Sequence, residues 1–317
     1  MNFELSDEQR AIAETSRDLL ASRKGSDDLW EQLCELGWPG ISIAEEHGGG
    51  GLGLVELVTL VHEHGYACAA TPLLGTTLAA LALEAGDAPD RDRLLSELAA
   101  GTRLGALAVA GESSLVPDAA ADRLLVTVDR TGSGGLLQDG DAVEEIPAID
   151  PTRAHGKPRG TDGGVALQGD LSGALDRAAV VVAAELAGLS RRALDLTVAY
   201  VKERKQFDVP VGSFQAVQHQ AAEMLRATEA ATTLAYHAAW MADAEPQNLP
   251  LAAAMAKASA SAAGRSVTAA AIQLHGGMGF TWEAEPHWLF KRAQIDAAYL
   301  GGAGFHQAAM ARSLAAA

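Results

Sequence analysis

The chain has 317 residues, of which 48% are hydrophobic and 21% are charged, a composition typical of folded soluble proteins and not of disordered or fibrous ones. Its 41 Asp and Glu against 24 Lys and Arg give a formal net charge of −17, which disfavours nucleic acid as a partner because such a surface repels phosphates. Its 2 cysteines are too few for a disulfide framework or a thiolate metal site, and neither a signal sequence nor an apolar membrane span is evident. We therefore expect a cytoplasmic protein without a metal that binds neither nucleic acid nor a membrane.

The first third of the chain is predicted to be helical. Ser6 and Gln9 have the spacing of a capping box, and the apolar residues that follow predict a helix that runs to about Ser22. Further periodic stretches predict helices over residues 27–36, 54–66 and 73–85. We therefore assign residues 1–102 to an N-terminal α-helical domain.

The middle and the last part of the chain differ in periodicity. Short apolar runs at residues 104–110 and 123–128, separated by glycines and prolines, predict a reduced β domain over residues 103–168. From residue 171 the apolar period returns to 3.6 and predicts helices over 171 to about 201, 214–243, 249–274, 286–298 and 304–316. Because alanine dominates these helices and lets them approach closely, we predict a C-terminal four-helix bundle domain over residues 169–317. The expected fold is mainly α with a small central β domain.

Two segments concentrate side chains that suit a cofactor. The run ERKQFDVPVGSFQ, residues 203–215, joins two long helices; Arg204 either caps helix carbonyls or binds a pyrophosphate with its planar guanidinium. Phe and Gln side chains in the same run can pack against a flat heteroaromatic ligand. The run IQLHGGMGFTWE, residues 272–283, has three glycines in four residues, which either end a helix or let a ligand touch the backbone.

At these segments, and nearly from end to end, the sequence resembles the acyl-CoA dehydrogenase family. The resemblance rests on FELSDEQRAI, WEQLCELGWPGISIAEEHGGGGLGLVELVTLVHEHG, ERKQFDVPVGSFQAVQHQAAEM and AAIQLHGGMGFTWE, which occur in the family's order and spacing. It implies an acyl-CoA dehydrogenase-like fold, an acyl-CoA substrate, an acceptor of the electron-transfer flavoprotein type, and dimers or tetramers that bind FAD across subunit interfaces. The cofactor would perform the hydride chemistry.

The resemblance also implies which residues meet FAD. Arg204, Gln206 and Phe207 would contact its pyrophosphate and ring system, with Phe214 and Gln215 nearby. The adenosine half of an FAD held mainly by a neighbouring subunit would meet three further residues, Gln273, Gly276 and Gly277.

The sequence departs from the family's pattern at the flavin wall and at the base. GESSLVPDAAADRL replaces a Thr-Glu-Pro stretch, and no tryptophan occurs between Trp38 and Trp240, so much of the usual flavin wall is missing. Leu300 stands where the family has the catalytic Glu of a Tyr-Glu-Gly-Thr stretch. Some members carry the base before an arginine at the start of the first bundle helix, where this chain has Asp176 and Arg177. The alternative for Asp176 is an acid near a helix start that the helix dipole stabilises.

A third departure concerns assembly. GFTWEAEPHWLFKRA resembles a subgroup of actinobacterial members that pair unlike subunits as α2β2 heterotetramers on steroid side chains or other bulky acyl-CoA esters. We therefore expect a subunit of an FAD-dependent enzyme that forms α,β-unsaturated acyl-CoA, with a partner that supplies the catalytic Glu. The alternatives are a self-sufficient homo-oligomer that uses Asp176 and a flavin-dependent monooxygenase on the same fold. His275, Trp282 and His287 are expected near the interface, with a metal site as the weaker alternative.

Overall fold

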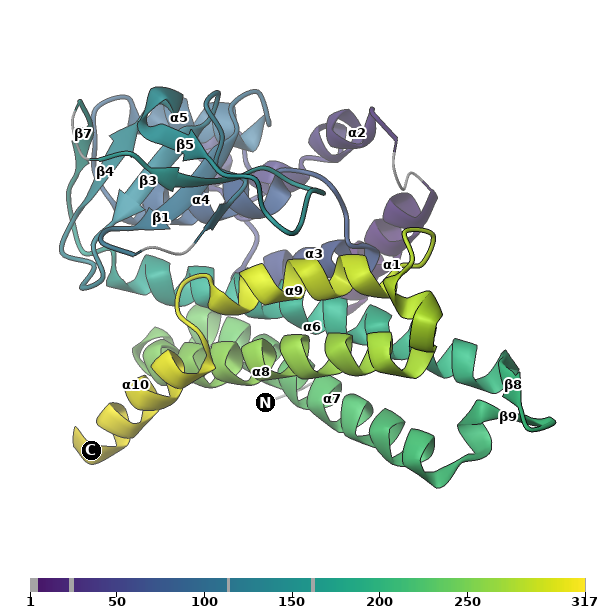
Figure 1. The fold of residues 1–317 in the computed structure, drawn as a ribbon. Helices are drawn as coiled ribbons and strands as arrows, with labels where there is room; N and C mark the ends of the chain where they lie inside the picture. Colours follow the sequence, from purple (N-terminus) through teal and green to yellow (C-terminus); the bar gives the residue numbers. More distant parts are fainter. Residues whose placement is uncertain (1–4, 23–25, 113–114, 161–162, 317) are drawn as a thin grey trace.

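A computed structural model describes residues 5–22, 26–112, 115–160 and 163–316 (Figure 1). The N-terminal helices are α1 (Asp7–Ser22), α2 (Leu29–Glu35), α3 (Leu54–Ala67), α4 (Leu73–Ala85) and α5 (Arg91–Ala99). The predicted capping box is present, because the Ser6 amide donates to Gln9 Oε1 at 2.9 Å and the Gln9 amide donates to Ser6 Oγ at 3.1 Å. The predicted helical character of this part is confirmed.

The middle segment forms two small sheets that stand on one side of the bundle (Figure 1). One sheet has the order β1-β3-β4-β7, with β1 (Gly105–Val109), β3 (Leu124–Val128), β4 (Gly135–Gln138) and β7 (Val165–Leu167). The other has the order β2-β6-β5, with β2 (Val116–Pro117), β6 (His155–Pro158) and β5 (Val143–Glu145). The two apolar runs predicted as strands are β1 and β3, which pair in parallel, and α4 covers them.

The C-terminal part is a bundle of long helices. Its elements are α6 (Ser172–Glu203), α7 (Gln215–Ala244), α8 (Leu249–His275), α9 (Pro286–Ala298) and α10 (Ala303–Ala316). Figure 1 shows α6, α7 and α8 side by side, with α9 along one flank and α10 extending from the end nearest the β sheets. No helix in the described part of the chain is both long enough and apolar enough to cross a membrane.

Helix α3 crosses α6 at a pair of glycines. A Cβ on Gly65 would lie 2.3 Å from the Glu185 carbonyl oxygen, and a Cβ on Gly188 would lie 2.0 Å from the His62 carbonyl oxygen. Only glycine therefore permits this crossing, since any side chain would push the helices apart. The close approach brings the N-terminal helices directly against the middle of α6.

Candidate active site and cofactor surface

The link between α6 and α7 is a tight hairpin at the bundle end that points away from the β sheets (Figure 1). Strand β8 (Lys205–Gln206) pairs with β9 (Val209–Pro210), and the turn residues Phe207 and Asp208 have φ angles of 54° and 65°. Positive φ at both central residues is the type I′ pattern, which Asn and Gly usually occupy. A phenylalanine in this conformation is strained, and such strain clusters at functional sites.

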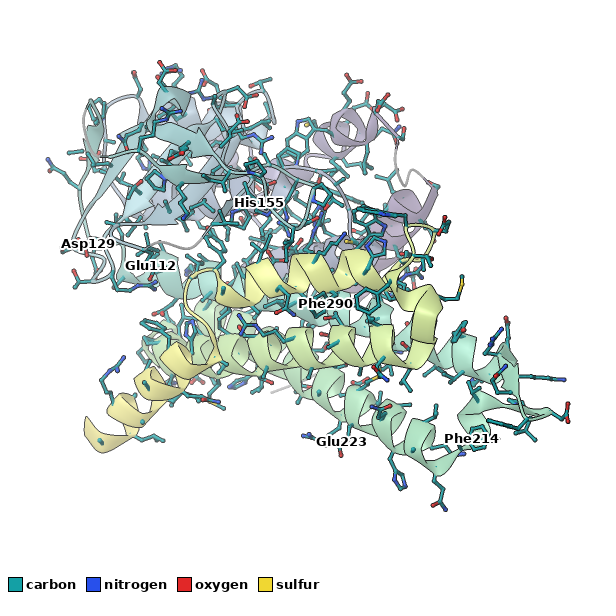
Figure 2. All side chains as sticks on the ribbon, in the orientation of Figure 1. Glu112, Asp129, His155, Phe214, Glu223 and Phe290 are labelled. Atoms are coloured by element: carbon teal, nitrogen blue, oxygen red, sulfur yellow. The ribbon has the colours of Figure 1, made fainter. Side chains whose placement is uncertain are left out.

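The hairpin presents a cationic and aromatic surface. The Arg204 side chain is exposed and has no hydrogen-bond or ion-pair partner among the described residues, so it does not cap the carbonyls of α6. Phe207 is 88% exposed, and its ring meets that of Phe214 edge-on with centroids 6.3 Å apart. Figure 2 shows Phe214 at this end of the bundle. A guanidinium and exposed aromatic rings on the same hairpin region are side chains that suit the pyrophosphate and ring system of FAD.

The two glutamines of the hairpin region are also exposed. Gln206 Nε2 donates to the Lys205 carbonyl oxygen at 2.8 Å, which holds its amide against the hairpin backbone. Gln215 is the first residue of α7 and faces solvent. Both side chains are therefore available to a molecule bound on this surface.

Phe207→Gly tests whether the strained turn is kept for cofactor binding. Glycine adopts positive φ without steric cost, so we expect the free energy of unfolding to stay unchanged or to rise by about 1 kcal/mol. Flavin content of the assembled protein should nevertheless fall several-fold, because the exposed ring is lost. Thermal unfolding and flavin absorbance measure the two effects. Asp208→Gly is the matched control and should keep its flavin; unchanged flavin in Phe207→Gly would remove the ring from the cofactor surface.

The end of α8 lies at the same end of the bundle. Gly276 has a φ of 60°, and a Cβ on Gly276 or Gly277 would meet no atom within 4 Å. The backbone here is therefore open to a ligand, and Gln273 beside it is exposed. The His275 ring stacks on that of Tyr200 in the last turn of α6, with centroids 4.4 Å apart. The structure thus brings both predicted cofactor segments together.

The predicted group of His275, Trp282 and His287 forms only in part. Trp282 packs against His287 with ring centroids 5.3 Å apart, whereas the His275 ring stacks on Tyr200 instead. In the described ranges no three His, Cys, Asp or Glu side chains lie close enough together to hold a metal ion.

The opposite end of the bundle contains a cavity of about 250 Å³, and the residues at both candidate base positions line it. Asp176, the fifth residue of α6, and Leu300, in the turn between α9 and α10, both line it. His306 of α10 lies beside them, and its Nε2 is 3.1 Å from the Leu300 carbonyl oxygen. Arg177 points elsewhere, since its guanidinium donates to the Ala242 carbonyl oxygen at 3.3 Å.

Burial is the cause of the shifted pKa of Asp176 and raises it to about 6. This direction is opposite to the one that a helix dipole by itself would produce. Burial likewise lowers the pKa of His306 to about 4, so this imidazole is neutral at pH 7. A carboxyl group in a cavity with a pKa raised by desolvation is typical of catalytic acids and bases.

The cavity and the cofactor surface are far apart on one chain. Asp176 and Arg204 lie at opposite ends of α6, so the rise of an α-helix places them about 40 Å apart. This separation exceeds the reach of any side chain. Arg204 and Asp176 of one chain therefore cannot serve the same reaction centre.

The β domain contributes little to the cavity. Of the described residues that line it, Arg130 is the one that comes from the β domain, and the others come from α6, α8, α10 and the turn at Leu300. The Arg130 guanidinium lies over the Phe305 ring, 4.7 Å from its centroid. The residues present at this end therefore do not by themselves form a wall for a flavin ring, in contrast to the open surface at the hairpin.

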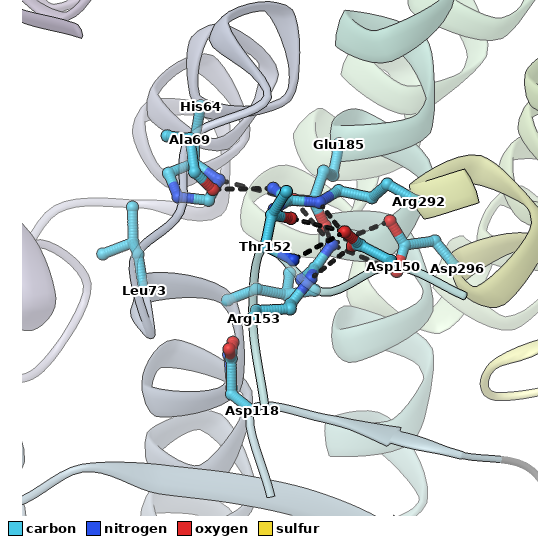
Figure 3. Close-up of polar contacts among 12 residues, drawn as sticks. His64, Ala69, Leu73, Asp118, Asp150, Thr152, Arg153, Glu185, Arg292 and Asp296 are labelled. Atoms are coloured by element: carbon cyan, nitrogen blue, oxygen red, sulfur yellow. Dashed lines mark hydrogen bonds and ion pairs between the residues drawn. The ribbon is translucent and has the colours of Figure 1, made fainter. Parts of the chain in front are cut away.

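A buried charge network, which the sequence analysis missed, joins the β domain to the bundle (Figure 3). Arg153, in the loop between β5 and β6, reaches with its Nη2 to Glu185 of α6 at 3.1 Å and to Asp296 of α9 at 3.0 Å. Arg292 of α9 donates from Nε to Asp150 at 3.0 Å. Glu185, Arg292 and Asp296 have no exposed surface. We call these five residues the buried charge network.

The positive and negative charges of the buried charge network are equal in number when one of its carboxyl groups is protonated. Burial acts to raise the pKa of Glu185, but Arg153 and other cations outweigh it and hold that pKa well below the ordinary value. Burial raises the pKa of Asp296 well above the ordinary value despite Arg153. With Asp296 protonated, two arginines face two carboxylates, which is the arrangement that buried charges require.

Comparison with known proteins identifies the class of this protein. Residues 6–102 match the acyl-CoA dehydrogenase N-terminal domain, and residues 170–315 match the acyl-CoA dehydrogenase C-terminal domain. The chain belongs to the acyl-CoA dehydrogenase family and is a flavin-dependent oxidoreductase by class.

Three individual proteins of known name are similar to this chain. The chain is 38% identical over 295 residues to the acyl-CoA dehydrogenase IpdE2 of Mycobacterium tuberculosis, which covers 90% of this chain and 86% of that protein. A solved structure of a variant of the Tcur3481-Tcur3483 steroid ACAD is similar with a TM-score of 0.85 and 27% identity over 98% of both chains. The ChsE4-ChsE5 complex from Mycobacterium tuberculosis shares the fold, with a TM-score of 0.86 and 22% identity.

Proposed function

We propose that this chain is a subunit of an FAD-dependent acyl-CoA dehydrogenase in which each FAD is shared between two chains. The separation of about 40 Å between Arg204 and Asp176 carries this proposal, because the cofactor surface can serve only a centre completed by another chain. Arg204, Gln206, Phe207, Phe214 and Gln215 would bind the pyrophosphate and ring system. The open backbone at Gly276 and Gly277, with Gln273, would receive the adenosine half.

The reaction is the α,β-dehydrogenation of an acyl-CoA thioester. FAD, when bound, supplies the acceptor for the hydride that leaves the β carbon. The protein must remove the proton from the α carbon. Asp176 lines the cavity and stands at the position where some members of the family carry the base. With a pKa of about 6 it is ionised at pH 7 yet more basic than an exposed aspartate, which suits a general base.

A second candidate leaves proton abstraction to a partner subunit that carries the family's usual Glu. Leu300 at the usual base position and the sparse β-domain lining of the cavity favour it. In that arrangement the hairpin of this chain binds the FAD of the partner's active site, and this chain catalyses no reaction at a site of its own.

The proposal extends to the partner and the substrate, for which the names of two similar solved structures give support. One similar solved structure is a steroid ACAD, and another is a complex of two different chains, ChsE4 and ChsE5. These support a bulky acyl-CoA ester, with a steroid side chain as the leading case, and an α2β2 assembly with a second acyl-CoA dehydrogenase-like chain. An acceptor of the electron-transfer flavoprotein type and a cytoplasmic location belong to the same proposal.

Co-expression with a second acyl-CoA dehydrogenase-like chain that retains the usual catalytic Glu tests the assembly. We expect the chain alone to hold substoichiometric FAD and the co-purified complex to hold FAD fully, as measured by flavin absorbance and native mass. One FAD per chain in a homo-oligomer would replace the heteromeric proposal with the self-sufficient one. Hydroxylation of substrate with O₂ and a flavin reductase would point to a monooxygenase instead.

Arg204→Ala should lower the flavin content of the assembled complex at least several-fold. The exposed guanidinium can make a bidentate, charge-assisted contact to phosphate, and alanine removes it. Arg226→Ala, which removes an exposed arginine paired with Glu223 on α7, is the matched control and should keep its flavin. Equal flavin content in both variants would exclude Arg204 from the cofactor surface.

A further inference from the structure

The turn between α9 and α10 carries Leu300 in an unusual backbone conformation. Leu300 and Gly301 have φ angles of 56° and 95°, in a region that leucine rarely adopts. A Cβ on Gly301 would lie 2.6 Å from Cδ1 of Phe305, so a larger residue would have to displace that ring. The Leu300 side chain is buried and lines the cavity at Asp176. A strained leucine in a cavity wall keeps its conformation only if the surrounding elements support it.

Lys257 of α8 supports this turn with two hydrogen bonds. Its Nζ donates to the Asp296 carbonyl oxygen at 3.1 Å and to the Gly301 carbonyl oxygen at 3.1 Å. A third bond runs to Ser261 Oγ on the same helix at 3.0 Å. Asp296 lies in the last turn of α9, where carbonyl groups lack partners within the helix. Because Asp296 precedes Leu300 and Gly301 follows it, Lys257 fixes the chain on both sides of Leu300.

Two further side chains hold the same turn. The Tyr299 hydroxyl donates to the Leu107 carbonyl oxygen of β1. His306 Nε2 of α10 lies 3.1 Å from the Leu300 carbonyl oxygen. Hydrogen bonds from α8, α10 and Tyr299 therefore leave Leu300 little freedom to move away from the cavity.

An amine is a costly group to bury for this purpose. The Lys257 side chain has no exposed surface, and none of its three acceptors is a carboxylate. Burial lowers the pKa of Lys257 to about 7, which reflects the cost of keeping the ammonium away from water. Both the ammonium and the neutral amine have at least two N–H groups, so both bonds to the carbonyls persist on either side of pH 7.

We propose that Lys257 is a positioning residue that holds Leu300 as a fixed wall of the cavity, and that Leu300 limits the size of the acyl group at its α carbon. This role rests on the proposed function, in which the acyl group enters the cavity and Asp176 removes the α proton. Leu300 and Asp176 line the same cavity of about 250 Å³, so a bound α carbon lies close to both. A branch on that carbon collides with a fixed leucine and fits beside a movable one.

Two CoA thioethers that cannot react test this role by binding alone. S-(3-cyclohexylpropyl)-CoA and its 2-methyl analogue have a CH₂ group in place of the thioester carbonyl, so no acidic α proton is present. Calorimetry on the assembled, flavin-loaded complex gives the Kd of each. We expect the branched ether to bind to the wild type at least about tenfold more weakly. Equal Kd values would overturn the proposal.

Substitutions at the wall and at its support should have the same effect. Lys257→Met and Leu300→Ala should each lower the ratio of the two Kd values at least about fivefold. A loss of global stability leaves this ratio unchanged, because both ethers are measured on the same folded variant. The double variant should match Leu300→Ala within about twofold, because Lys257 acts through Leu300.

Ser261→Ala is the matched control for Lys257→Met. It removes one acceptor of the Lys257 amine and leaves both bonds to the turn, so the ratio should stay within about twofold of the wild type. If Lys257→Met does not assemble, Lys257→Gln is measured in the same way, because its amide ends one bond short of the lysine nitrogen.

The outcomes separate this role from the proposed function. A lowered ratio in Leu300→Ala but not in the Lys257 variant would refute the positioning role and leave the proposed function intact. Additive effects in the double variant would show that Lys257 does not act through Leu300. An unchanged ratio in Leu300→Ala would show that the acyl group does not enter this cavity, which would overturn the proposed function together with the role of Lys257.

Discussion

Asp176→Asn is expected to lower turnover of the assembled, flavin-loaded complex by roughly 10²–10⁴-fold, the usual contribution of a general base. The amide has nearly the shape of the carboxyl group but cannot accept the proton. The same change should stabilise the fold at pH 7, because burial raises the pKa of Asp176 to about 6 from about 3.9 in the unfolded chain. The charged form thus costs stability, and we expect a gain of about 2–3 kcal/mol.

The stability gained by Asp176→Asn should depend on pH. A carboxyl group whose pKa is raised in the folded state binds more protons folded than unfolded between pH 4 and 6, so wild-type stability falls as pH rises through that window. The Asn variant lacks this slope, and its stability advantage should vanish below about pH 4. The activity profile of the wild type should likewise show an ionisation near pH 6.

Asp170→Asn is the control for Asp176→Asn. Asp170 is exposed and accepts a hydrogen bond from the Ser172 amide at 3.0 Å, at the start of the same helix. The Asp170→Asn substitution removes one negative charge near the start of the same helix, and Asp170 does not line the cavity. A loss of turnover below a few-fold for Asp176→Asn, with full flavin, would assign the base to the partner subunit.

Arg153→Met is expected to destabilise the folded chain by about 3–5 kcal/mol at pH 7. Its guanidinium is the shared partner of Glu185 and Asp296, both fully buried. Its removal leaves Arg292 as the one arginine of the network for the two carboxylates of Glu185 and Asp150. Chemical denaturation at matched pH measures the loss. Arg93→Met breaks exposed pairs with Asp90 and Glu97 and should leave stability nearly unchanged, because water screens exposed ion pairs.

The loss caused by Arg153→Met should stay nearly constant from pH 7 to about pH 4.3 and shrink as pH falls below that value. The folded pKa of Glu185 is lowered, so its contribution to stability is present above the unfolded pKa of about 4.3 and is lost as pH falls. The variant has already lost that contribution. Adding Glu185→Leu to Arg153→Met should recover part of the stability, because no charge is then left unpaired. A double variant as unstable as the sum of the singles would show that the two residues act independently.

Local patterns were sufficient to predict most of the helices and two of the strands. The period of 3.6 residues identified α6 to α10 to within about two residues, since the pattern reports a buried face along one continuous segment. The capping box at Ser6 was read correctly because both partners lie within one turn. Helix α5 (Arg91–Ala99) escaped prediction, because nine residues with several charges carry too little apolar periodicity.

The proposed cofactor surface and the cavity at Asp176 differ in how much of them the sequence could predict. Arg204, Phe207 and Gly276 lie in short, dense motifs that can be recognised in the sequence, and the antiparallel helices place these motifs at one end of the bundle. That Asp176 and Leu300 share one cavity was not visible, since only the folded bundle brings the start of α6 beside the turn after α9.

By itself the sequence determined the helical class and the family, because these depend on patterns and motifs of neighbouring residues. Only the tertiary structure decided burial, and burial determines electrostatics. In the sequence, Glu185 and Arg292 look like charges on solvated helix faces, yet the crossing of α3 and α6 and the packing of α9 enclose them completely. Removing water makes each charge depend on partners from distant segments, which no local pattern contains.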